Sequence, residues 1–436
     1  MRKLYFIESI YTNPRVENQQ VEVNMTPADD SEEEWNPEYF TFRVQNFRIN
    51  SPGDIQEGQY VFYDDGAKEN EPAFTDGSFS LVAQREIGRS IYLRASLLQR
   101  AESIMEKVLL GEDKIIFDDA KVTSFHVNVG HGNCSLILIQ REEEKYLWMV
   151  DCSVREMPNK ALRHWVCHQL EIEKTFAYIK SIAGFKDVEK LHIDHFLLTH
   201  MHFDHYNGLK YLIDQGYVDS KTVFYINLHY QWPSRHLNDI WQLMINKNIT
   251  AVIEPNSVNS SSCIHILHPE CRIYKDKTSI LEMAPKYRFS SNPNNSSAVY
   301  AIRLSGKAMV FPGDLEQEGF DAMTKTGACI MDWKYINFYA ASHHCSFNGL
   351  PIRHCKNLIK CYNPLRCFRR NLKVTIIMGR DEAYDGIYSR YAEYVYGLQS
   401  LVGVFKSDDD IIKPPFPVCS TTYVELDWDK EYVYNK

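Results

Sequence analysis

The stretch that decides the fold lies at residues 192–205, HIDHFLLTHMHFDH, where an apolar run ends in a cluster of histidines and an aspartate. The run at 196–198 predicts a short buried strand. It is followed by His200, His202, Asp204 and His205. Imidazole and carboxylate groups are the ligands that suit zinc, iron and manganese. One tight turn can aim the first two residues at one ion and the last two at a second ion.

Two later strands are expected to end in residues of the same kind. AMVFPGD at 308–314 ends at Asp314, and YINFYAASHH at 335–344 ends at His343 and His344. Taken alone, such an aspartate is more often a turn residue or a helix N-cap, and such a histidine a core residue. Strand ends are, however, where α/β folds place their sites. Three such ends in one chain therefore predict a site for two divalent ions.

The 436-residue chain is long enough for two or three units. Residues 1–118 combine strand-like alternation with a helical pattern at 90–111, and we expect an N-terminal accessory α+β domain of unknown role. In residues 119–436 strands and helices interleave, which predicts an α/β domain. Hydrophobic residues make up 44% and charged residues 24% of the chain, as in soluble globular proteins.

Composition narrows the class of protein further. The net charge of -9 argues against a protein that only coats nucleic acid, without excluding a local basic channel. No apolar stretch is long enough for a transmembrane helix, so no membrane partner is expected. The N-terminus has no signal-peptide pattern, which favours a cytoplasmic location. The 11 scattered cysteines read as mostly buried thiols. The set formed by Cys345, Cys355, Cys361 and Cys367 lacks the spacing of a metal site.

The order of these motifs resembles the metallo-β-lactamase superfamily, and within it the hydrolase domain of ComEC-type competence proteins. The matching segments are VGHGNCSLI at 129–137, WMVDCS ending its strand at Asp151, LHP at 267–269, NNSS at 294–297, GDL at 313–315 and HHCS at 343–346. The resemblance covers about residues 121–428. It implies an αββα sandwich for the second domain and a hydrolase that works through a metal-activated water.

The resemblance also implies roles for individual residues. Two divalent ions, zinc or manganese, would be bound by His200, His202, Asp204, His205, Asp314 and His343. The first two histidines would hold the first ion, and Asp314 would bridge both. Asp151 would orient the histidine loop. His344 would face the cleft and act on the substrate beside Asp204.

The chain departs from this pattern at three places. Asn294 and Asn295 stand where many members carry a further histidine, so we expect the first ion to be held weakly or completed by water. Cys345 replaces a glycine, and His131 stands where glutamine is more common. His131 is as easily a structural residue, and His229 and His268 are better read as core or supporting residues.

A basic run bears on the substrate. Residues 353–373 contain seven Lys or Arg and no Asp or Glu. The run is either a solvated surface or a phosphate-binding rim beside the metals. With the resemblance, it favours a phosphodiesterase or nuclease that binds nucleic acid or nucleotides through Arg366, Arg369 and Arg370.

Two alternatives to a nuclease stay open. One is a hydrolase of a small ester, lactone or phosphorylcholine substrate. The other is a metal-binding effector subunit of a multi-protein, defence-type system, with a protein partner bound through residues 1–118.

Overall fold

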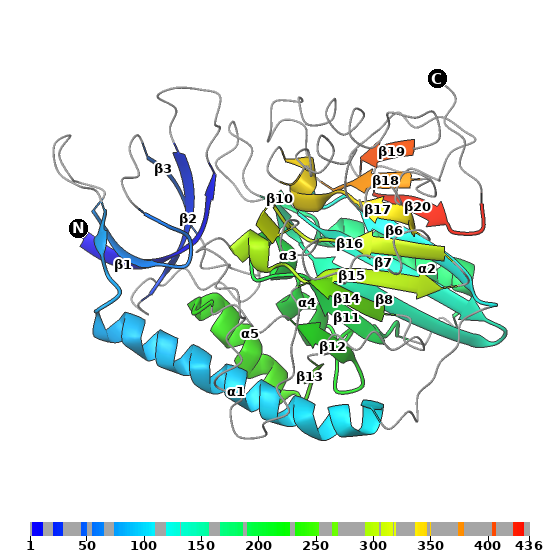
Figure 1. The fold of residues 1–436 in the computed structure, drawn as a ribbon, viewed down its shortest axis with the longest axis horizontal. Coiled ribbons are helices and arrows are strands. Elements are labelled where there is room, and N and C mark those ends of the chain that lie inside the picture. The colour runs from blue at the N-terminus through cyan, green and yellow to red at the C-terminus, as the bar shows by residue number, and fades with distance from the viewer. Residues whose placement is uncertain are drawn as a thin grey trace, which may run out of the picture.

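A computed structural model gives the fold (Figure 1). It describes residues 2–11, 21–28, 45–49, 55–64, 74–109, 119–130, 132–156, 166–185, 190–226, 232–252, 264–268, 293–304, 307–316, 318–319, 336–346, 349, 374–378, 403–406 and 422–430.

A seven-stranded mixed sheet carries the histidine cluster. Its strands run in the order β13-β12-β11-β8-β7-β6-β20. They are β6 (Lys121–Val127), β7 (Cys134–Arg141), β8 (Glu144–Cys152), β11 (His195–Leu198), β12 (Val223–Ile226), β13 (Thr250–Val252) and β20 (Tyr423–Asp427). Strand β11 pairs in parallel with both β8 and β12. The ends of β8 and β11 therefore meet at one edge, which is where the cluster begins.

A six-stranded sheet packs face to face with the first one. Its order is β14-β15-β16-β17-β18-β19. The strands are β14 (Ile264–His268), β15 (Val299–Leu304), β16 (Lys307–Phe311), β17 (Ile336–Ala340), β18 (Val374–Ile377) and β19 (Gly403–Lys406). Trp148 of the first sheet and Tyr300 and Phe338 of the second belong to one buried cluster.

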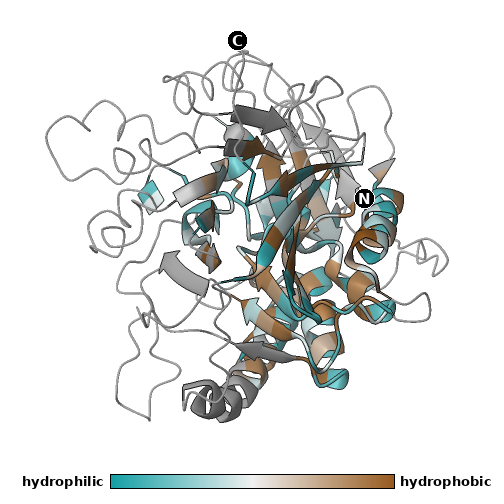
Figure 2. Ribbon diagram, turned by 90° about the vertical axis from the view of Figure 1, so that its right-hand side faces the viewer, coloured by the Kyte–Doolittle hydropathy of each residue, from teal (hydrophilic) through white to brown (hydrophobic). Residues whose placement is uncertain are grey.

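Helices cover the other face of the seven-stranded sheet. They are α2 (Gln169–Ala183), α3 (Phe203–Tyr206), α4 (Leu209–Asp214) and α5 (Arg235–Asn246). Along β7, Leu136 and Leu138 belong to the core under these helices, whereas Ile137 and Ile139 face the second sheet. This follows from the alternation of side chains along a strand. Figure 2 shows the resulting concentration of hydrophobic residues in the strands at the centre of the molecule.

The α/β class expected from the sequence is confirmed by these mixed sheets and helices. From residue 119 onward the described residues provide one helical layer, these two packed sheets and a small antiparallel pair, β9 (Arg155–Glu156) with β10 (Val166–Cys167). The second helical layer that the αββα resemblance implies, beyond the six-stranded sheet, would fall on residues outside the described ranges. The complete αββα sandwich thus stays a prediction.

The first part of the chain forms a separate five-stranded antiparallel sheet and a long helix, which together we call the N-terminal unit. The sheet has the order β3-β2-β1-β4-β5. Its members are β1 (Arg2–Tyr11), β2 (Val21–Pro27), β3 (Gln45–Ile49), β4 (Tyr60–Asp64) and β5 (Phe74–Asp76), followed by α1 (Leu81–Leu109). The predicted boundary at 118 adjoins residues 110–118, outside the described part of the chain, and stays a prediction.

The N-terminal unit packs against the start of α5. The Tyr60 hydroxyl donates to the carbonyl of Pro233 at 2.7 Å, and the rings of Phe6 and Trp232 meet edge to face at 5.2 Å. Helix α1 also contacts α5 and edge strand β13, and Figure 1 shows it running below both. Arg89 of α1 pairs with Asp239 of α5 at 2.9 Å.

Candidate metal centre

Asp151, the last but one residue of β8, fixes the start of the histidine loop. Its Oδ1 accepts a hydrogen bond from the backbone N–H of Thr199, and its Oδ2 accepts one from the Thr199 hydroxyl, both at 2.8 Å. Oδ2 also lies 2.8 Å from Nδ1 of His205. Asp151 therefore ties the end of β8 to both ends of the loop that follows β11.

The first group of candidate ligands consists of His200, His202 and Asp314, whose ligand atoms lie within 4.8 Å of one another. All three residues are buried. Nε2 of His200 lies 4.0 Å from Oδ2 of Asp314. Its Nδ1 lies 3.2 Å from the Thr199 hydroxyl oxygen.

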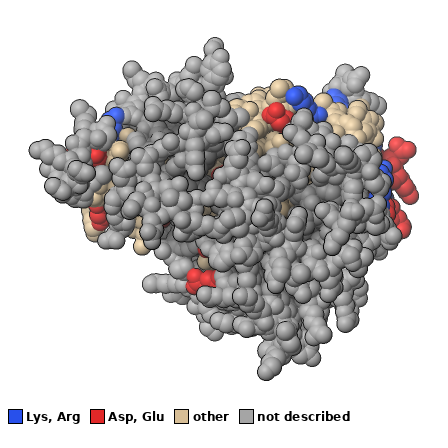
Figure 3. All heavy atoms as spheres, turned by 90° about the horizontal axis from the view of Figure 1, so that it is seen from above, with Lys and Arg blue, Asp and Glu red and all other residues tan. Residues whose placement is uncertain are grey.

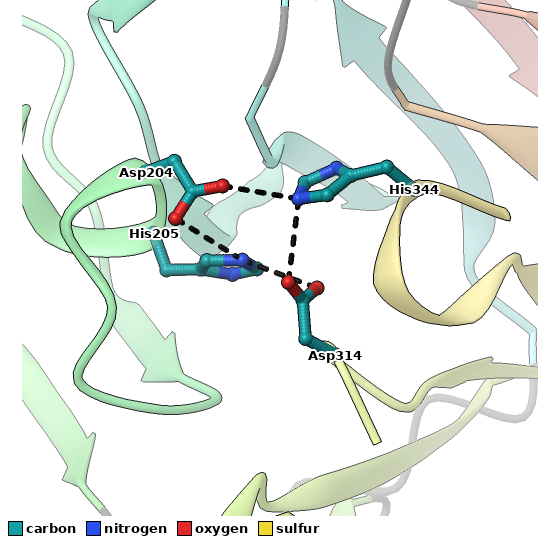
Figure 4. A group of neighbouring side chains, drawn as sticks. All are labelled: Asp204, His205, Asp314 and His344. Atoms are coloured by element: carbon teal, nitrogen blue, oxygen red, sulfur yellow. Dashed lines mark hydrogen bonds and ion pairs between the residues drawn. The ribbon is translucent and has the colours of Figure 1, made fainter. Parts of the chain in front are cut away.

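The second group consists of Asp204, His205, Asp314 and His344, also within 4.8 Å of one another (Figure 4). Nε2 of His205 lies 3.2 Å from Oδ1 of Asp314. Nε2 of His344 lies 3.1 Å from Oδ2 of Asp204 and 3.3 Å from Oδ2 of Asp314. Asp314 belongs to both groups, so its carboxylate can face two ions at once.

Gly313 lets the loop after β16 approach the loop after β11. Its φ is +57°, and a Cβ there would lie 2.7 Å from Cβ of Thr199, too close for any side chain. The backbone N–H of Asp314 then donates to the hydroxyl of Ser297 at 3.2 Å. A glycine before the aspartate is thus required by packing as well as by backbone conformation.

His343 and His344 follow β17 in a turn where both residues have positive φ, 49° and 51°. This conformation costs about 1–3 kcal/mol per non-glycine residue and persists only where the surroundings enforce it. The backbone N–H of His343 donates to the carbonyl of Gly313 at 3.1 Å, which joins this turn to the Asp314 loop.

The structure places these two histidines differently from what the sequence predicts. The sequence predicted His343 as ligand and His344 as the residue facing the substrate. Instead His344 is buried in the second group, and its Nδ1 lies 2.6 Å from the carbonyl oxygen of Met378. The His343 side chain is 18% exposed, and its Nδ1 lies 3.4 Å from Oε1 of Glu316. The positive φ angles redirect both side chains, so their order along the chain does not give their direction.

The carboxylates and imidazoles of the centre shift one another's pKa values strongly. Burial by itself would raise the pKa of Asp204, but His205 and His344 hold it well below its usual value. Burial would lower the pKa of His344, but Asp314 and Asp204 raise it to about 10. The same opposing causes raise the pKa of His205 well above its usual value. The buried carboxylates therefore favour positive charge at the centre.

The donor set fits divalent metal ions. Within the described residues, buried Nε2 of His200 makes no hydrogen bond, and Nε2 of His205 and Oδ1 of Asp314 have only their 3.2 Å contact with each other. Buried polar atoms nearly always have such partners, so atoms without one require an explanation. Imidazole nitrogens and carboxylate oxygens gathered this closely are the ligands of zinc and similar ions. The residues present can thus hold two ions that share Asp314.

Two acidic residues beside the centre were not predicted from the sequence. Oε2 of Glu57, in the N-terminal unit, lies 3.2 Å from Nε2 of His202. Glu316 contacts His343 and accepts a hydrogen bond from Nδ2 of Asn294 at 3.0 Å. Glu316 could have been suspected because it lies two residues after Asp314. Glu57 could not, because it lies in a different part of the chain.

Several predicted features fall outside the described residues. These are His131, His229, the basic run at 353–373 with Arg366, Arg369 and Arg370, and the cysteines Cys355, Cys361 and Cys367. On the face seen in Figure 3, the Lys and Arg atoms of the described residues are interspersed with Asp and Glu.

Comparison with known families agrees with the motif and the geometry. Residues 127–223 match the family model described as the metallo-beta-lactamase superfamily. The match includes Asp151 and the cluster from His200 to His205, and ends before Asp314 and His344. No curated protein matches the chain. In the described parts of the chain, no helix has both the length and the apolar character needed to cross a membrane.

Proposed function

We propose that the chain is a hydrolase of phosphodiester bonds that uses two divalent ions, zinc or manganese, and acts on nucleic acid or nucleotides. The observation that carries the proposal is the buried arrangement of His and Asp around Asp314, which belongs to both ligand groups. The superfamily match supports a metal-dependent hydrolase. The more specific relationship to ComEC-type domains, the complete αββα sandwich and the cytoplasmic location belong to the same proposal.

The ligands follow from the two groups. His200, His202 and Asp314 would hold one ion, and Asp204, His205, His344 and Asp314 the other. Bound ions would activate a water molecule and stabilise the charge that develops on the scissile group. Asp151 keeps His205 oriented through the 2.8 Å contact with its Nδ1.

His343 is the imidazole best suited to act on the substrate. It adjoins the centre, with its Nε2 3.9 Å from Oδ2 of Asp314, yet it is not a member of either ligand group. Its contact with Glu316 orients the ring. In this proposal His343 donates a proton to the leaving oxygen, which is the role that the sequence had suggested for His344.

The decisive experiment is a substrate screen of the metal-loaded protein. It should include single- and double-stranded DNA, RNA, cyclic nucleotides, a simple phosphodiester, carboxylic esters, lactones and phosphorylcholine esters. Asp204→Ala and Asp314→Ala serve as inactive controls. We expect cleavage of phosphodiesters alone. Cleavage of only the carboxylic esters, lactones or phosphorylcholine esters would overturn the nucleic-acid proposal, and bound metal without any turnover would favour an effector subunit.

The basic run provides an independent test of the substrate. If Arg366, Arg369 and Arg370 neutralise phosphates, affinity for DNA or RNA should fall with salt by about 0.7–0.9 log units per log unit of salt for each phosphate neutralised. The triple alanine variant should bind more weakly and show a flatter salt dependence, while hydrolysis of a simple phosphodiester persists. An unchanged salt dependence would show that the run is ordinary solvated surface.

A further inference from the structure

Three of the four imidazoles in the two ligand groups share one arrangement. Nδ1 of His205 contacts Asp151, Nδ1 of His344 contacts the carbonyl oxygen of Met378, and Nδ1 of His200 contacts the hydroxyl of Thr199. In each, Nε2 is left for the carboxylates of the centre. Such an outer partner fixes the tautomer and the orientation of a metal-binding histidine.

His202 is the fourth imidazole, and its outer partner comes from the N-terminal unit. Nε2 of His202 is buried, with Oε2 of Glu57 at 3.2 Å. The other oxygen of Glu57, Oε1, accepts a hydrogen bond from the backbone N–H of Ile10 at 2.7 Å. One carboxylate therefore links strand β1 to the histidine loop. The Glu57 side chain is 19% exposed, so water screens this contact only in part.

The turn that carries Glu57 is pressed against the hydrolase part of the chain. Gly58 has a φ of +79°, and a Cβ on it would lie 3.0 Å from the ring of Trp232. Its N–H donates to the carbonyl of Ile7 at 2.9 Å. The Trp232 ring in turn lies 5.5 Å from the ring of His202. The turn, the tryptophan and the histidine therefore pack together as one cluster.

A buried carboxylate, that of Glu8, holds this cluster in place through hydrogen bonds. Glu8 is fully buried, and it accepts hydrogen bonds from Nε1 of Trp232 at 3.1 Å, from the hydroxyl of Thr26 at 2.6 Å and from the hydroxyl of Ser234. Glu8 and Thr26 belong to β1 and β2 of the N-terminal unit, whereas Ser234 caps α5 and Trp232 lies just before it, so the bonds from Trp232 and Ser234 cross between the two parts. The position of Glu57 is thus set by the fold and not by a loose loop contact.

We propose that Glu57 is a positioning residue of the metal centre, so that the N-terminal unit supplies part of the first ion's site. With the ion bound, its carboxylate would accept the Nε2–H of His202, which would leave the lone pair of a neutral imidazole on Nδ1 for the ion. The inference rests on the proposed function only in that the centre binds metal. It does not depend on the substrate.

The test measures metal affinity in the full-length protein. Zn²⁺ is titrated in competition with a chromophoric chelator, and Co²⁺ is substituted so that its visible spectrum reports the coordination of each ion. Glu57→Ala should lower the affinity for one ion by about 10–100-fold and alter the Co²⁺ spectrum of that site, while the affinity for the other ion stays unchanged. Glu57→Gln keeps an oxygen acceptor without the charge, and it should restore part of the affinity.

Gln56→Ala is the matched control, because Gln56 lies on the same turn with an exposed side chain. It should leave both affinities unchanged. Urea unfolding of each variant in chelator checks that the fold is retained. Unchanged metal affinity in Glu57→Ala, together with loss of one ion in His202→Ala, would overturn this inference and leave the hydrolase proposal intact. A wild-type protein that binds no metal would overturn both. Bound metal without hydrolysis would overturn only the proposed function.

Discussion

Replacement of Asp151 by asparagine should weaken metal binding while the fold is kept. Asparagine retains one oxygen, which can still accept the backbone N–H of Thr199. Its amide N–H groups then face two atoms, the Thr199 hydroxyl oxygen and Nδ1 of His205. The hydroxyl can rotate and accept a hydrogen bond from the amide. To accept one as well, His205 must lose its Nδ1 proton and carry the proton on Nε2. That is the nitrogen that lies 3.2 Å from Asp314 and would bind the ion.

The size of the effect follows from these contacts. Loss of the outer partner of a metal-binding histidine costs about 10–100-fold in affinity, which corresponds to about 1.4–2.7 kcal/mol. The fold should lose less, about 0.5–1.5 kcal/mol, because the tautomeric change keeps each buried group paired. Asparagine also tolerates the φ of 53° at this position. Asp151→Ala, in contrast, leaves buried donors without acceptors at about 1–3 kcal/mol each.

The assay combines metal titration against a chelator with urea unfolding in the absence of metal. Asp194→Asn is the matched control, because Asp194 also accepts a backbone N–H, that of Leu147 at 2.7 Å, but lies at the opposite end of β11. It should leave metal affinity unchanged. If Asp151→Asn binds both ions as tightly as the wild type, Asp151 does not control the tautomer of His205 and the reasoning is refuted.

Three further outcomes are expected. Elemental analysis should show that His344→Ala binds one ion fewer than the wild type, whereas His343→Ala binds both ions but loses turnover. Equal loss of metal in the two variants would contradict the placement of the two histidines. Zn²⁺ at about one hundred times its dissociation constant should raise the free energy of urea unfolding by about 2.7 kcal/mol, and no increase would argue against a metal centre. Burial lowers the pKa of His126 to about 3 and of His195 to about 4. The unfolded chain therefore takes up protons first, and the free energy of unfolding should fall between about pH 6.5 and 4 by up to about 1.4 kcal/mol per pH unit for each histidine. His126→Gln should flatten this decline, and a wild-type profile without it would contradict the burial argument.

Local patterns were enough to predict the strands that carry the site. The patterns CSLILIQ at 134–140 and YLWMVDCS at 146–153 predict β7 and β8, and the run before His200 predicts β11. Each of these strands is defined by its own alternating or continuous apolar residues, which the sequence displays directly. The ligand cluster follows β11 without interruption, so its residue types and position were visible as well.

Features fixed by distant contacts could not be predicted. The helical pattern at 90–111 gave the later part of α1, but the helix begins at Leu81. Gly88 weakens the helical propensity of this first part. Bonds to α5 hold this first part of the helix. Nδ2 of Asn238 in α5 donates to the backbone carbonyl of Glu86 and to its Oε2. Likewise, the direction of His344 depends on a strained turn, and the contact of Glu57 depends on how two separate sheets pack.

The position of α1 has a consequence for solubility. Among the described strands, β13, three residues long, is the last on one side of the seven-stranded sheet, and α1 lies against it. An uncovered sheet edge offers unpaired backbone groups to other chains and promotes aggregation. A chain is synthesised from its N-terminus, so α1 is already available to pack when β13 emerges from the ribosome. A fragment that starts near residue 119 would expose this edge together with the ring of Trp232, and it should self-associate even though it retains the histidine cluster.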